Sequence, residues 1–428
     1  MFSEKEKEDL DLLVETGKRQ AGKLSSMIVT NYFVGFPSER QTEVTYNEVL
    51  EYLLQAGVVV QDDESEIEND EEDDHSPMPE IRPFDPSKID IDMKTMELSS
   101  IIKRLEYDEI NMNTDFQRKS GLWSDVQKSR LIESLLLRIP IQAFYFDGGI
   151  KDNWLIIDGL QRITALKEFA VDKKLKLVGM EFFKDLNGAK FTDLPRAFVR
   201  RIEETNIVAY IVRGGTPPNV KYNIFKRINT GGLQLKPQEI RHALYQGKAT
   251  RLCNRFAKFD EFQSATTFSI RDDRMMDQEF ILRFVAVCYF GIDKYEGVPD
   301  NYLNGAMEYL NSEECADEKE IEKEFKWVMT ASKNIMGKYA FRKLGKDGIR
   351  RPINKAIYEA WCRSLFYFND SEIKDLIEKK DKVYNEFLVL CNNPGFLQAI
   401  KSSDKKAFLM RFTSVKQMLQ EVLNDKKD

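Results

Sequence analysis

The stretch Asp158-Gly159-Leu160-Gln161-Arg162 holds the residues whose types and spacing are best suited to chemistry. It follows the apolar run WLIID and opens an amphipathic run, which predicts a turn between a buried strand and a helix. Helix N-termini bind anions, because their free N–H groups and their dipole point outward. The glycine allows close approach to the backbone, and the arginine could clamp a phosphate in bidentate fashion.

Asp158, Gln161 and Arg162 are therefore the candidate catalytic residues of this turn. Asp158 could cap the helix, orient an arginine or hold a magnesium ion. Gln161 could orient a water molecule or contact a base edge. We expect Asp158 and Arg162 to face outward, away from the core. An ordinary strand–turn–helix with an aspartate cap and a surface arginine would have the same pattern, and the spacing leaves both interpretations open.

A second patch, Phe116-Gln117-Arg118, precedes Trp123 and is predicted to lie at a strand end. Glutamine and arginine beside an aromatic ring could contact a nucleotide or a phosphate. Taken alone, however, the patch is better explained as a strand edge with a core tryptophan.

Two more patches lie further along the chain. The segment 225–232 has the sequence FKRINTGG, in which a helix C-terminus explains a glycine but not the whole polar set. The segment 238–241, QEIR, opens a helix, and its ordinary interpretation is a dipole pair on a solvated face. The candidate nucleotide-binding residues come from the first three patches and are Gln117, Arg118, Asp158, Gly159, Gln161, Arg162, Arg227, Asn229 and Thr230.

Alternating strands and helices must position these residues. Ser124 with Gln127 forms a capping-box pattern ahead of a helix that ends before Pro140. The runs 143–147 and 154–158 predict a hairpin joined through Gly148 and Gly149. Helices are predicted over 161–170, 194–204, 222–232 and 237–247, a strand over 206–212, and mostly helix beyond 250.

The four patches together resemble the N-terminal domain of GmrSD-type restriction endonucleases, in the ParB/sulfiredoxin-like superfamily. The matching text is FQRKSGLWSDVQKSRLIESLLLRIPIQAFYFD, then IIDGLQRITAL, then FKRINTGGLQLKPQEIRHALYQG. The resemblance spans about residues 97–250, and Leu160 departs from the glutamine that is commoner at this place. DDRMMDQEFILRF and NKAIYEAW also look like the helical extension of stand-alone members.

The resemblance implies a nucleotide pocket around the DGxQR turn, with Arg118, Asp158, Gln161, Arg162, Arg227 and Asn229 around it. Family members use nucleoside triphosphates in the restriction of DNA, often of modified phage DNA. Many restriction members add a C-terminal HNH nuclease domain, which needs a histidine. Because no histidine follows His242, we expect that this chain is not a self-sufficient HNH nuclease.

Composition narrows the class of protein. The 428 residues are 42% hydrophobic and 32% charged, which is typical of a soluble globular chain. We find no apolar run long enough for a membrane span and no signal-peptide pattern. The five cysteines lack metal spacing, which indicates reduced thiols, a cytoplasmic protein and no metal-binding cluster. The two histidines, His75 and His242, argue against His-metal nuclease chemistry.

Charge is distributed unevenly along the chain. Residues 1–90 carry 23 acids and 8 bases, a net of −15, whereas the remainder has a net of +8. Residues 61–80 carry 11 acids and no base. A basic body suits a polyanion such as DNA, and we expect the acidic head to weaken polyanion binding by the rest. A tail that only aids solubility would have the same composition.

The head is predicted to contain two helices, Glu6–Lys18 and a second from about Thr45 to a stop at Gly57. Their predicted inward residues are Leu10, Leu13, Val14, Val49, Leu53 and Leu54. LLVETGKRQAGKLS and TYNEVLEYLLQAGVVVQDDESE are similar to region 1.1 of housekeeping bacterial sigma factors. That resemblance implies an acidic module that shields a basic groove or docks a partner, although no promoter-binding sigma regions follow.

We therefore predict an α+β fold class with four regions. These are a small helical domain over 1–60, an acidic disordered linker over 61–88, a ParB/sulfiredoxin-like domain over 89–250 and a helical region over 251–428.

Three functional hypotheses follow. The first is a nucleotide-dependent defence protein that binds DNA and a nucleoside triphosphate with Mg²⁺. The second is a non-enzymatic sensor or adaptor for a nucleotide or modified DNA, regulated by its head and working with a nuclease or another protein. The third is a nuclease acting through Asp158 and a metal. The sequence leaves open whether the chain is an NTPase.

Overall fold

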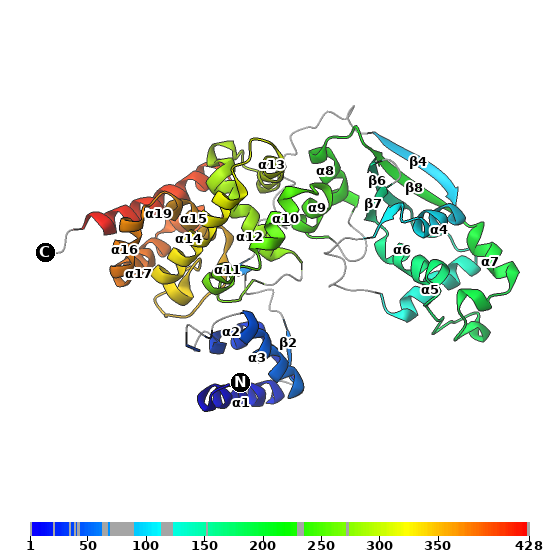
Figure 1. Ribbon diagram of the computed structural model, residues 1–428, viewed down its shortest axis with the longest axis horizontal. Helices are drawn as coiled ribbons and strands as arrows, with labels where there is room; N and C mark the ends of the chain where they lie inside the picture. Colours follow the sequence, from blue (N-terminus) through cyan, green and yellow to red (C-terminus); the bar gives the residue numbers. More distant parts are fainter. Residues whose placement is uncertain are drawn as a thin grey trace. The chain divides into compact units, whose positions relative to one another are not determined.

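The computed structural model describes residues 2–19, 22–33, 36–37, 40, 43–61, 67–68, 90–112, 123–150, 153–228, 235–270 and 274–425. The chain divides into two compact units (Figure 1). The sheet unit is Glu80–Leu244, and the helical unit combines Met1–Pro79 with Tyr245–Asp428. The sheet unit is thus inserted in sequence between the two parts of the helical unit. The predicted α+β fold class is confirmed.

A five-stranded sheet, counted over the described residues, forms the centre of the sheet unit. Its order is β4-β8-β6-β7-β5, in which β8/β6 and β7/β5 are parallel and the other pairs are antiparallel. The strands are β4 Ile91–Glu97, β5 Ile110–Asn111, β6 Phe144–Ile150, β7 Asn153–Asp158 and β8 Asn206–Arg213.

Helices cover both faces of this sheet, because apolar side chains alternate along its strands. Phe144 and Phe146 belong to a core with residues of α4, α5, α6 and α7, whereas Ile157 and Val212 join a smaller core with α8 and α9. The helices are α4 Leu98–Glu106, α5 Asp125–Leu136, α6 Leu160–Leu166, α7 Arg196–Glu203, α8 Pro218–Ile228 and α9 Pro237–Leu244. A π-helical turn, η6 Lys167–Val171, continues α6.

The predicted capping box is confirmed: Ser124 and Gln127 exchange side-chain and backbone hydrogen bonds at the start of α5. The predicted hairpin is also present, but its glycines are placed differently from the expectation. Gly148 and Gly149 lie inside β6, where the register with β7 shifts between Asp147 and Ile150. They therefore belong to a strand irregularity and not to the turn.

The helical unit is built mostly of helices, as predicted for the chain beyond residue 250. Its helices after Tyr245 are α10 Lys248–Phe256, α11 Asp260–Ala265, α12 Met276–Val285, α13 Pro299–Asn311, α14 Glu318–Met336, α15 Lys355–Phe366, α16 Asp370–Glu378, α17 Lys380–Cys391, α18 Pro394–Ala399 and α19 Lys405–Asn424. The π-helical turn η9 Ala286–Phe290 follows α12. Short 3-10 turns are η7 Lys184–Leu186 and η8 Phe191–Asp193 in the sheet unit, and η10 Ile292–Lys294 and η11 Gly337–Tyr339 here.

A buried network of charges joins α12, α15 and α19. Arg283 donates to Glu279 at 2.9 Å and to Glu359 at 2.5 Å, and Arg411 donates to the other oxygen of Glu359 at 2.9 Å. Lys355 lies 3.3 Å from Glu279. All five side chains are at most 10% exposed, so each charge is neutralised mainly by other charges of the network.

The head contains more structure than the sequence predicted. Its elements are α1 Glu4–Arg19, β1 Lys23–Ser25, α2 Ser26–Phe33, α3 Glu43–Gln55 and β2 Val59–Gln61, with β1 parallel to β2. Leu10, Leu13, Val14, Val49 and Leu53 are buried as predicted. Leu54 is instead 63% exposed, because α3 turns that position away from the head core. The helix α2 was not predicted.

Most of the predicted linker lies outside the described residues. The exception is β3 Ile67–Glu68, which pairs in parallel with the strand β9 Ile353–Asn354 of the helical unit.

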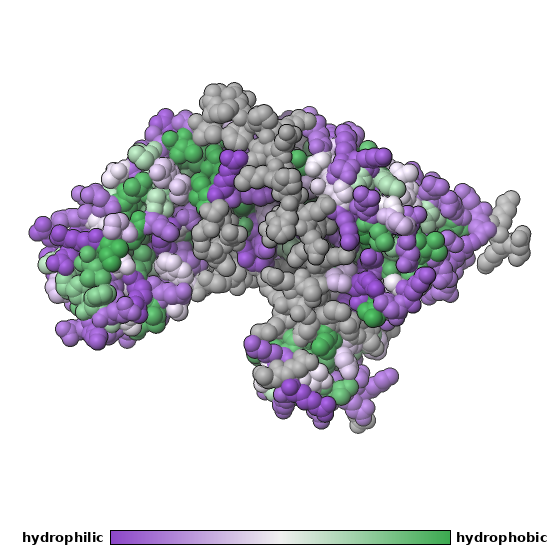
Figure 2. Space-filling model, turned by 180° about the vertical axis from the view of Figure 1, so that it is seen from behind, coloured by the Kyte–Doolittle hydropathy of each residue, from purple (hydrophilic) through white to green (hydrophobic). Residues whose placement is uncertain are grey.

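Hydrophilic and hydrophobic residues are interspersed on the surface of both units in the view of Figure 2. Within the described ranges, no helix has both the length and the apolar character that crossing a membrane requires. The five cysteines are free thiols.

Candidate functional site

The strand–turn–helix predicted for the DGxQR stretch is present. The strand β7 ends at Asp158, and Gly159 precedes α6 with a φ of +99°, in the left-handed region that favours glycine. A Cβ at this position would also lie 2.7 Å from the Phe144 ring. Conformation and close packing therefore both require a glycine at this turn.

Arg162 faces the interior, contrary to the expectation that it points outward. It is only 7% exposed, and its guanidinium lies 4.8 Å from the centre of the Phe144 ring. Its Nη1 donates to the backbone carbonyls of Gln142 and, at 3.2 Å, Ala143, just before β6. Burial lowers the pKa of the guanidinium, and Asp158 offsets part of that shift. Arg162 therefore fixes the start of β6 to the turn.

Asp158 is the exposed charged partner of this arginine. Its Oδ2 accepts a hydrogen bond from Arg162 Nη2 at 2.7 Å, and its side chain is 26% exposed. It is not the N-cap of α6, which is Gly159, and among the described residues its side-chain hydrogen bond is the one to Arg162. Of the roles considered for Asp158, the structure supports pairing with an arginine: Arg162 binds the carboxylate, which remains partly exposed to solvent.

Gln161 links the turn to the segment that carries Gln117 and Arg118. Its Oε1 accepts a hydrogen bond from the backbone N–H of Trp123 at 3.1 Å. At the other end of that segment, Asn111 in β5 pairs with Leu155 in β7. Gln117 and Arg118 themselves lie outside the described residues, but both ends of their segment are attached to the β7–α6 unit.

Arg227 is exposed in the last turn of α8. Its neighbours Phe225 and Ile228 pack in the same cluster as Ile157, one residue before Asp158. Asn229 and Thr230 follow and lie outside the described residues. The helix α8 therefore packs on the sheet face that carries Ile157, and its C-terminal turn carries Arg227.

The sequence analysis missed a stacked pair of tyrosines next to Asp158. Tyr145 and Tyr210 stack with their ring centres 4.8 Å apart, and Tyr145 stands opposite Asp158 in the register of β6 and β7. Burial raises the pKa of Tyr145, with smaller contributions from Tyr210 and Asp158. The signal was the alternation in AFYFD and NIVAYIV, where each tyrosine faces the sheet side opposite the main core.

The segment 238–241 was interpreted as a solvated face, and this is wrong. Gln238, Glu239 and Arg241 are each 1% exposed, and His242 is buried beside them. Glu239 accepts a hydrogen bond from the backbone N–H of Lys236 at 2.6 Å, which secures the start of α9. The first turns of α9 therefore carry buried polar side chains.

A buried carboxylate anchors the chain that follows η6. Glu133, on α5, accepts hydrogen bonds from the backbone N–H groups of Glu181, Phe182 and Phe183, at 3.1, 2.8 and 3.1 Å. Burial alone would raise the pKa of Glu133, but these bonds and the nearby Arg130 outweigh it and leave the pKa below its usual value. The charge therefore stabilises this loop.

The described residues contain no group of three His, Cys, Asp or Glu side chains arranged to hold a metal ion.

Residues 98–246 match the family described as GmrSD restriction endonuclease, N-terminal domain. The matched region is therefore similar to a GmrSD N-terminal domain. It covers about a third of the 428 residues and includes the turn, α8 and α9. Searches of curated proteins and of solved structures find no match. The likeness of the head to sigma region 1.1 stays a prediction, as does the ParB-like assignment of the sheet.

Proposed function

We propose that this chain is a nucleotide-dependent phage-defence protein that binds a nucleoside triphosphate at the DGxQR turn and binds DNA. The observation that carries this proposal is the arrangement of Asp158: Arg162 orients the carboxylate from inside, and about a quarter of the side chain remains open to solvent. The GmrSD family match supports the restriction role.

The donor set at the turn fits a magnesium nucleotide. Mg²⁺ is usually held in proteins by one or two carboxylates together with the phosphates themselves, and Asp158 supplies one such carboxylate. The ion would neutralise phosphate charge there. Gln161 would position the segment of Gln117 and Arg118, and Arg227, Asn229 and Thr230 would contact phosphate or sugar from the α8 side.

The role of Arg162 is then to position, not to clamp a phosphate directly. Its Nη1 and Nη2 donate to protein acceptors, so the cationic contacts to a nucleotide fall to Arg118 and Arg227. This distribution also favours the second candidate, a sensor that binds a nucleotide without turnover, because the best-oriented cation faces inward. Hydrolysis of ATP, GTP, CTP and UTP, with and without DNA, distinguishes the two.

The decisive experiment compares nucleotide affinity of the wild-type protein and Asp158→Asn by calorimetry in the presence of Mg²⁺. Loss of a charged contact should weaken binding by about 1.5–3 kcal/mol, roughly 10- to 150-fold. Asp172→Asn is the matched control: Asp172 directly follows η6, is 23% exposed and also pairs with a cation, Lys167, at 2.7 Å. Equal affinity in Asp158→Asn and the wild type would refute the site.

A further inference from the structure

One row of side chains crosses the sheet beside the DGxQR turn. Met93 in β4 stands opposite Tyr210 in β8, and Tyr210 stands opposite Tyr145 in β6. Tyr145 in turn stands opposite Asp158 in β7. Side chains that stand opposite one another on neighbouring strands point to the same face of a sheet. These four side chains, here called the tyrosine row, therefore lie on one face.

A β-bulge brings Asp158 onto this face. Phe146 pairs with Ile156. Its neighbour Tyr145 pairs with Asp158, so Ile157 is an extra residue in β7. Without the bulge, the alternation of the strand would place Asp158 on the side of Ile156, in the main core. Burial raises the pKa of Tyr145 and the Asp158 charge adds to the rise, as expected for two neighbours on the same face.

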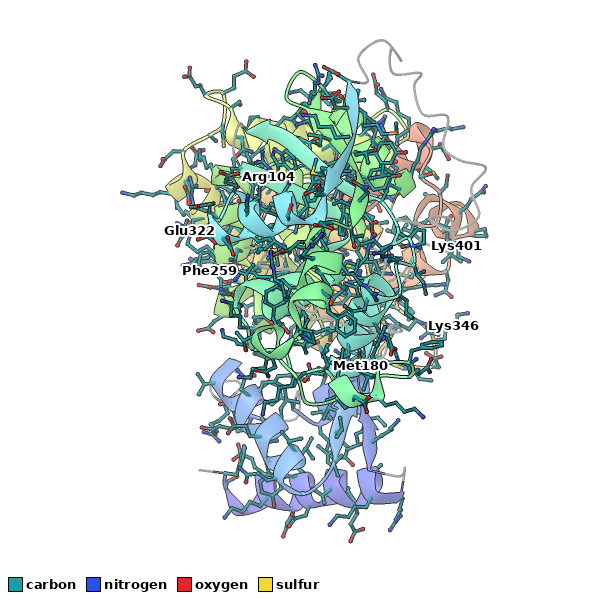
Figure 3. All side chains as sticks on the ribbon, turned by 90° about the vertical axis from the view of Figure 1, so that its right-hand side faces the viewer. Arg104, Met180, Phe259, Glu322, Lys346 and Lys401 are labelled. Carbon is teal, nitrogen blue, oxygen red and sulfur yellow. The ribbon has the colours of Figure 1, made fainter. Side chains whose placement is uncertain are left out.

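The tyrosine row lies at the border between the covered and the open part of this face. Val212, two residues after Tyr210 in β8, is fully buried in the small core with α8 and α9. On β4, in contrast, Met93 is 64% exposed, and Thr95 is also exposed. The helix α4, which carries Arg104 (labelled in Figure 3), packs in the main core and therefore covers the opposite face. A ligand therefore has access to the row from the part of the face that β4 contributes.

The two tyrosines stack so that an outer ring face looks toward the edge of the sheet. Their ring centres lie 4.8 Å apart with 14° between the ring planes, so each ring covers one face of the other. The other face of Tyr210 looks toward the edge strand β4, where Met93 stands opposite. Aromatic rings stack on such a face, and a methionine side chain adapts to a ring placed against it. The Tyr210 end of the row is thus suited to a flat, unsaturated ring.

We propose that Tyr210 and Met93 hold the base of the nucleotide whose phosphates bind at Asp158. This inference rests on the proposed function, because it takes the DGxQR turn as the phosphate end of the site. Continuity of the row carries the choice of occupant. A carboxylate suited to phosphate-bound Mg²⁺ stands at one end and an aromatic face at the other, which matches the two ends of a nucleotide.

The dimensions of the sheet agree with this occupant. The strands β7 and β4 are three strand spacings apart in the order β4-β8-β6-β7, which is about 14 Å. An extended nucleoside triphosphate crosses such a span, with its ribose over Tyr145. The exposed Arg227, on the helix that packs on the same face, is available to the phosphates.

Recognition of this kind tolerates different bases. Stacking uses the flat face that every base has, whereas discrimination between bases requires hydrogen bonds to their edges. We therefore expect Tyr210 to strengthen the binding of all four ribonucleoside triphosphates. Inorganic triphosphate has no base, so its binding should not depend on Tyr210.

The test is calorimetry on the full chain with Mg²⁺ and five probes: ATP, GTP, CTP, UTP and inorganic triphosphate. Tyr210→Leu removes the aromatic face but keeps an apolar side chain on β8, and Tyr210→Trp keeps an aromatic face. Tyr107→Leu is the matched control, because Tyr107 is 76% exposed and directly follows α4, which packs in the main core.

We expect Tyr210→Leu to weaken each nucleotide by about 5- to 150-fold, the range for a base stacked on an aromatic side chain, and to leave inorganic triphosphate unchanged. Tyr210→Trp should keep the affinity for nucleotides. Its added tryptophan fluorescence should be quenched by the nucleotides but not by inorganic triphosphate. The Tyr107→Leu control should bind all five probes like the wild type.

The outcomes separate the base site from the phosphate site. Nucleotide binding that Asp158→Asn weakens and Tyr210→Leu does not would overturn the base site and leave the proposed function standing. The same holds if inorganic triphosphate binds the wild type as tightly as the nucleotides do. Nucleotide binding that Tyr210→Leu weakens and Asp158→Asn does not would support the base site and refute the phosphate site. A wild-type chain that binds none of the five probes would overturn both.

Discussion

The buried charges beside the candidate site and those of the helical unit are held by different kinds of partner. In the sheet unit, Arg162 and Glu133 bind mainly backbone groups, two carbonyls in one case and three N–H groups in the other. In the helical unit, Glu279, Arg283 and Glu359 bind other charged side chains. The first arrangement fixes strand ends and loops, and the second ties whole helices together.

The difference determines what each cluster can tolerate. Removing one member of a buried charge network is strongly destabilising, because the remaining members stay buried with an excess of charge of one sign. A charge bound by backbone groups leaves behind neutral polar groups, which cost less when they lose a partner. The sheet unit should therefore accept changes near its site that the helical unit would not accept in its network.

The largest expected effect is in the helical network. Glu359→Ala removes the carboxylate shared by Arg283 and Arg411, and should lower the free energy of unfolding of the helical unit by about 3–5 kcal/mol. Chemical denaturation followed by helical circular dichroism measures this. Glu386→Ala, at an exposed position of α17, is the control and should stay within about 0.5 kcal/mol. If Glu359→Ala and Glu386→Ala are equally stable, the buried charge network does not stabilise the helical unit as we infer, and the difference between the two kinds of cluster disappears.

Arg162→Ala should cost less, about 2 kcal/mol of sheet-unit stability, because Asp158 still reaches water once its partner is lost. Exchange of the β6 amides should increase, and nucleotide binding should fall with it. Arg200→Ala removes an exposed pair with Glu204 and should have almost no effect. If the Arg162→Ala protein is as stable as the wild type but no longer binds nucleotide, our assignment is wrong, and Arg162 contacts the phosphate directly.

Glu133→Gln should destabilise the loop 181–183 by about 1–2 kcal/mol at neutral pH, since the charge is lost and the amide NH2 cannot accept the N–H that one carboxylate oxygen accepts. The folded-state pKa of Glu133 lies below the unfolded value, so its stabilisation is present above about pH 4.3 and is lost as pH falls through the folded pKa. Exchange of the three loop amides should therefore differ between variant and wild type at pH 7 and converge in acid. Glu204→Gln, which is exposed, is the control.

The smallest effect concerns charges that remain in solvent. Neutralising Asp70, Glu71, Glu72, Asp73 and Asp74 as amides should tighten binding of a DNA duplex several-fold at low salt, with the gain shrinking as salt rises. Fluorescence anisotropy at several salt concentrations measures the change. Affinity that is unchanged or weaker at every salt concentration would show that these five acids do not shield the rest of the chain from DNA.

Local patterns predicted the frame of the site well. The strand, the turn at Gly159, the capping box of Ser124 and the helices of the sheet unit follow from signals within a few residues of each other. The burial of Arg162 could not be predicted this way, because the carbonyls that hold it lie 19 and 20 residues earlier in the chain. An arginine four residues after an aspartate is compatible with a surface pair until the position of β6 is known.

The other differences have the same origin. Glu239 and Arg241 have the composition of a solvated face, but both are buried, and Arg241 lies 5.5 Å from the centre of the Tyr222 ring of α8. Leu54 fits the helical period of α3, but the head core lies on the side of Val49 and Leu53. Phe268 packs against Phe33 and Tyr46, which lie more than 200 residues earlier in the chain, and no local pattern reveals this contact.

The insertion of the sheet unit into the helical unit also sets an order of events during synthesis. The strands β4 and β8 are complete before any residue beyond Tyr245 leaves the ribosome, so the sheet can close while the helical unit is still half made. The head emerges before the sheet unit, but Phe268 follows Phe33 by more than 200 residues. The aromatic core of the head therefore lacks Phe268 while the whole sheet unit is synthesised and can fold. During that interval Phe33 and Tyr46 lack their contact with Phe268, and a chaperone or an early partner could bind them.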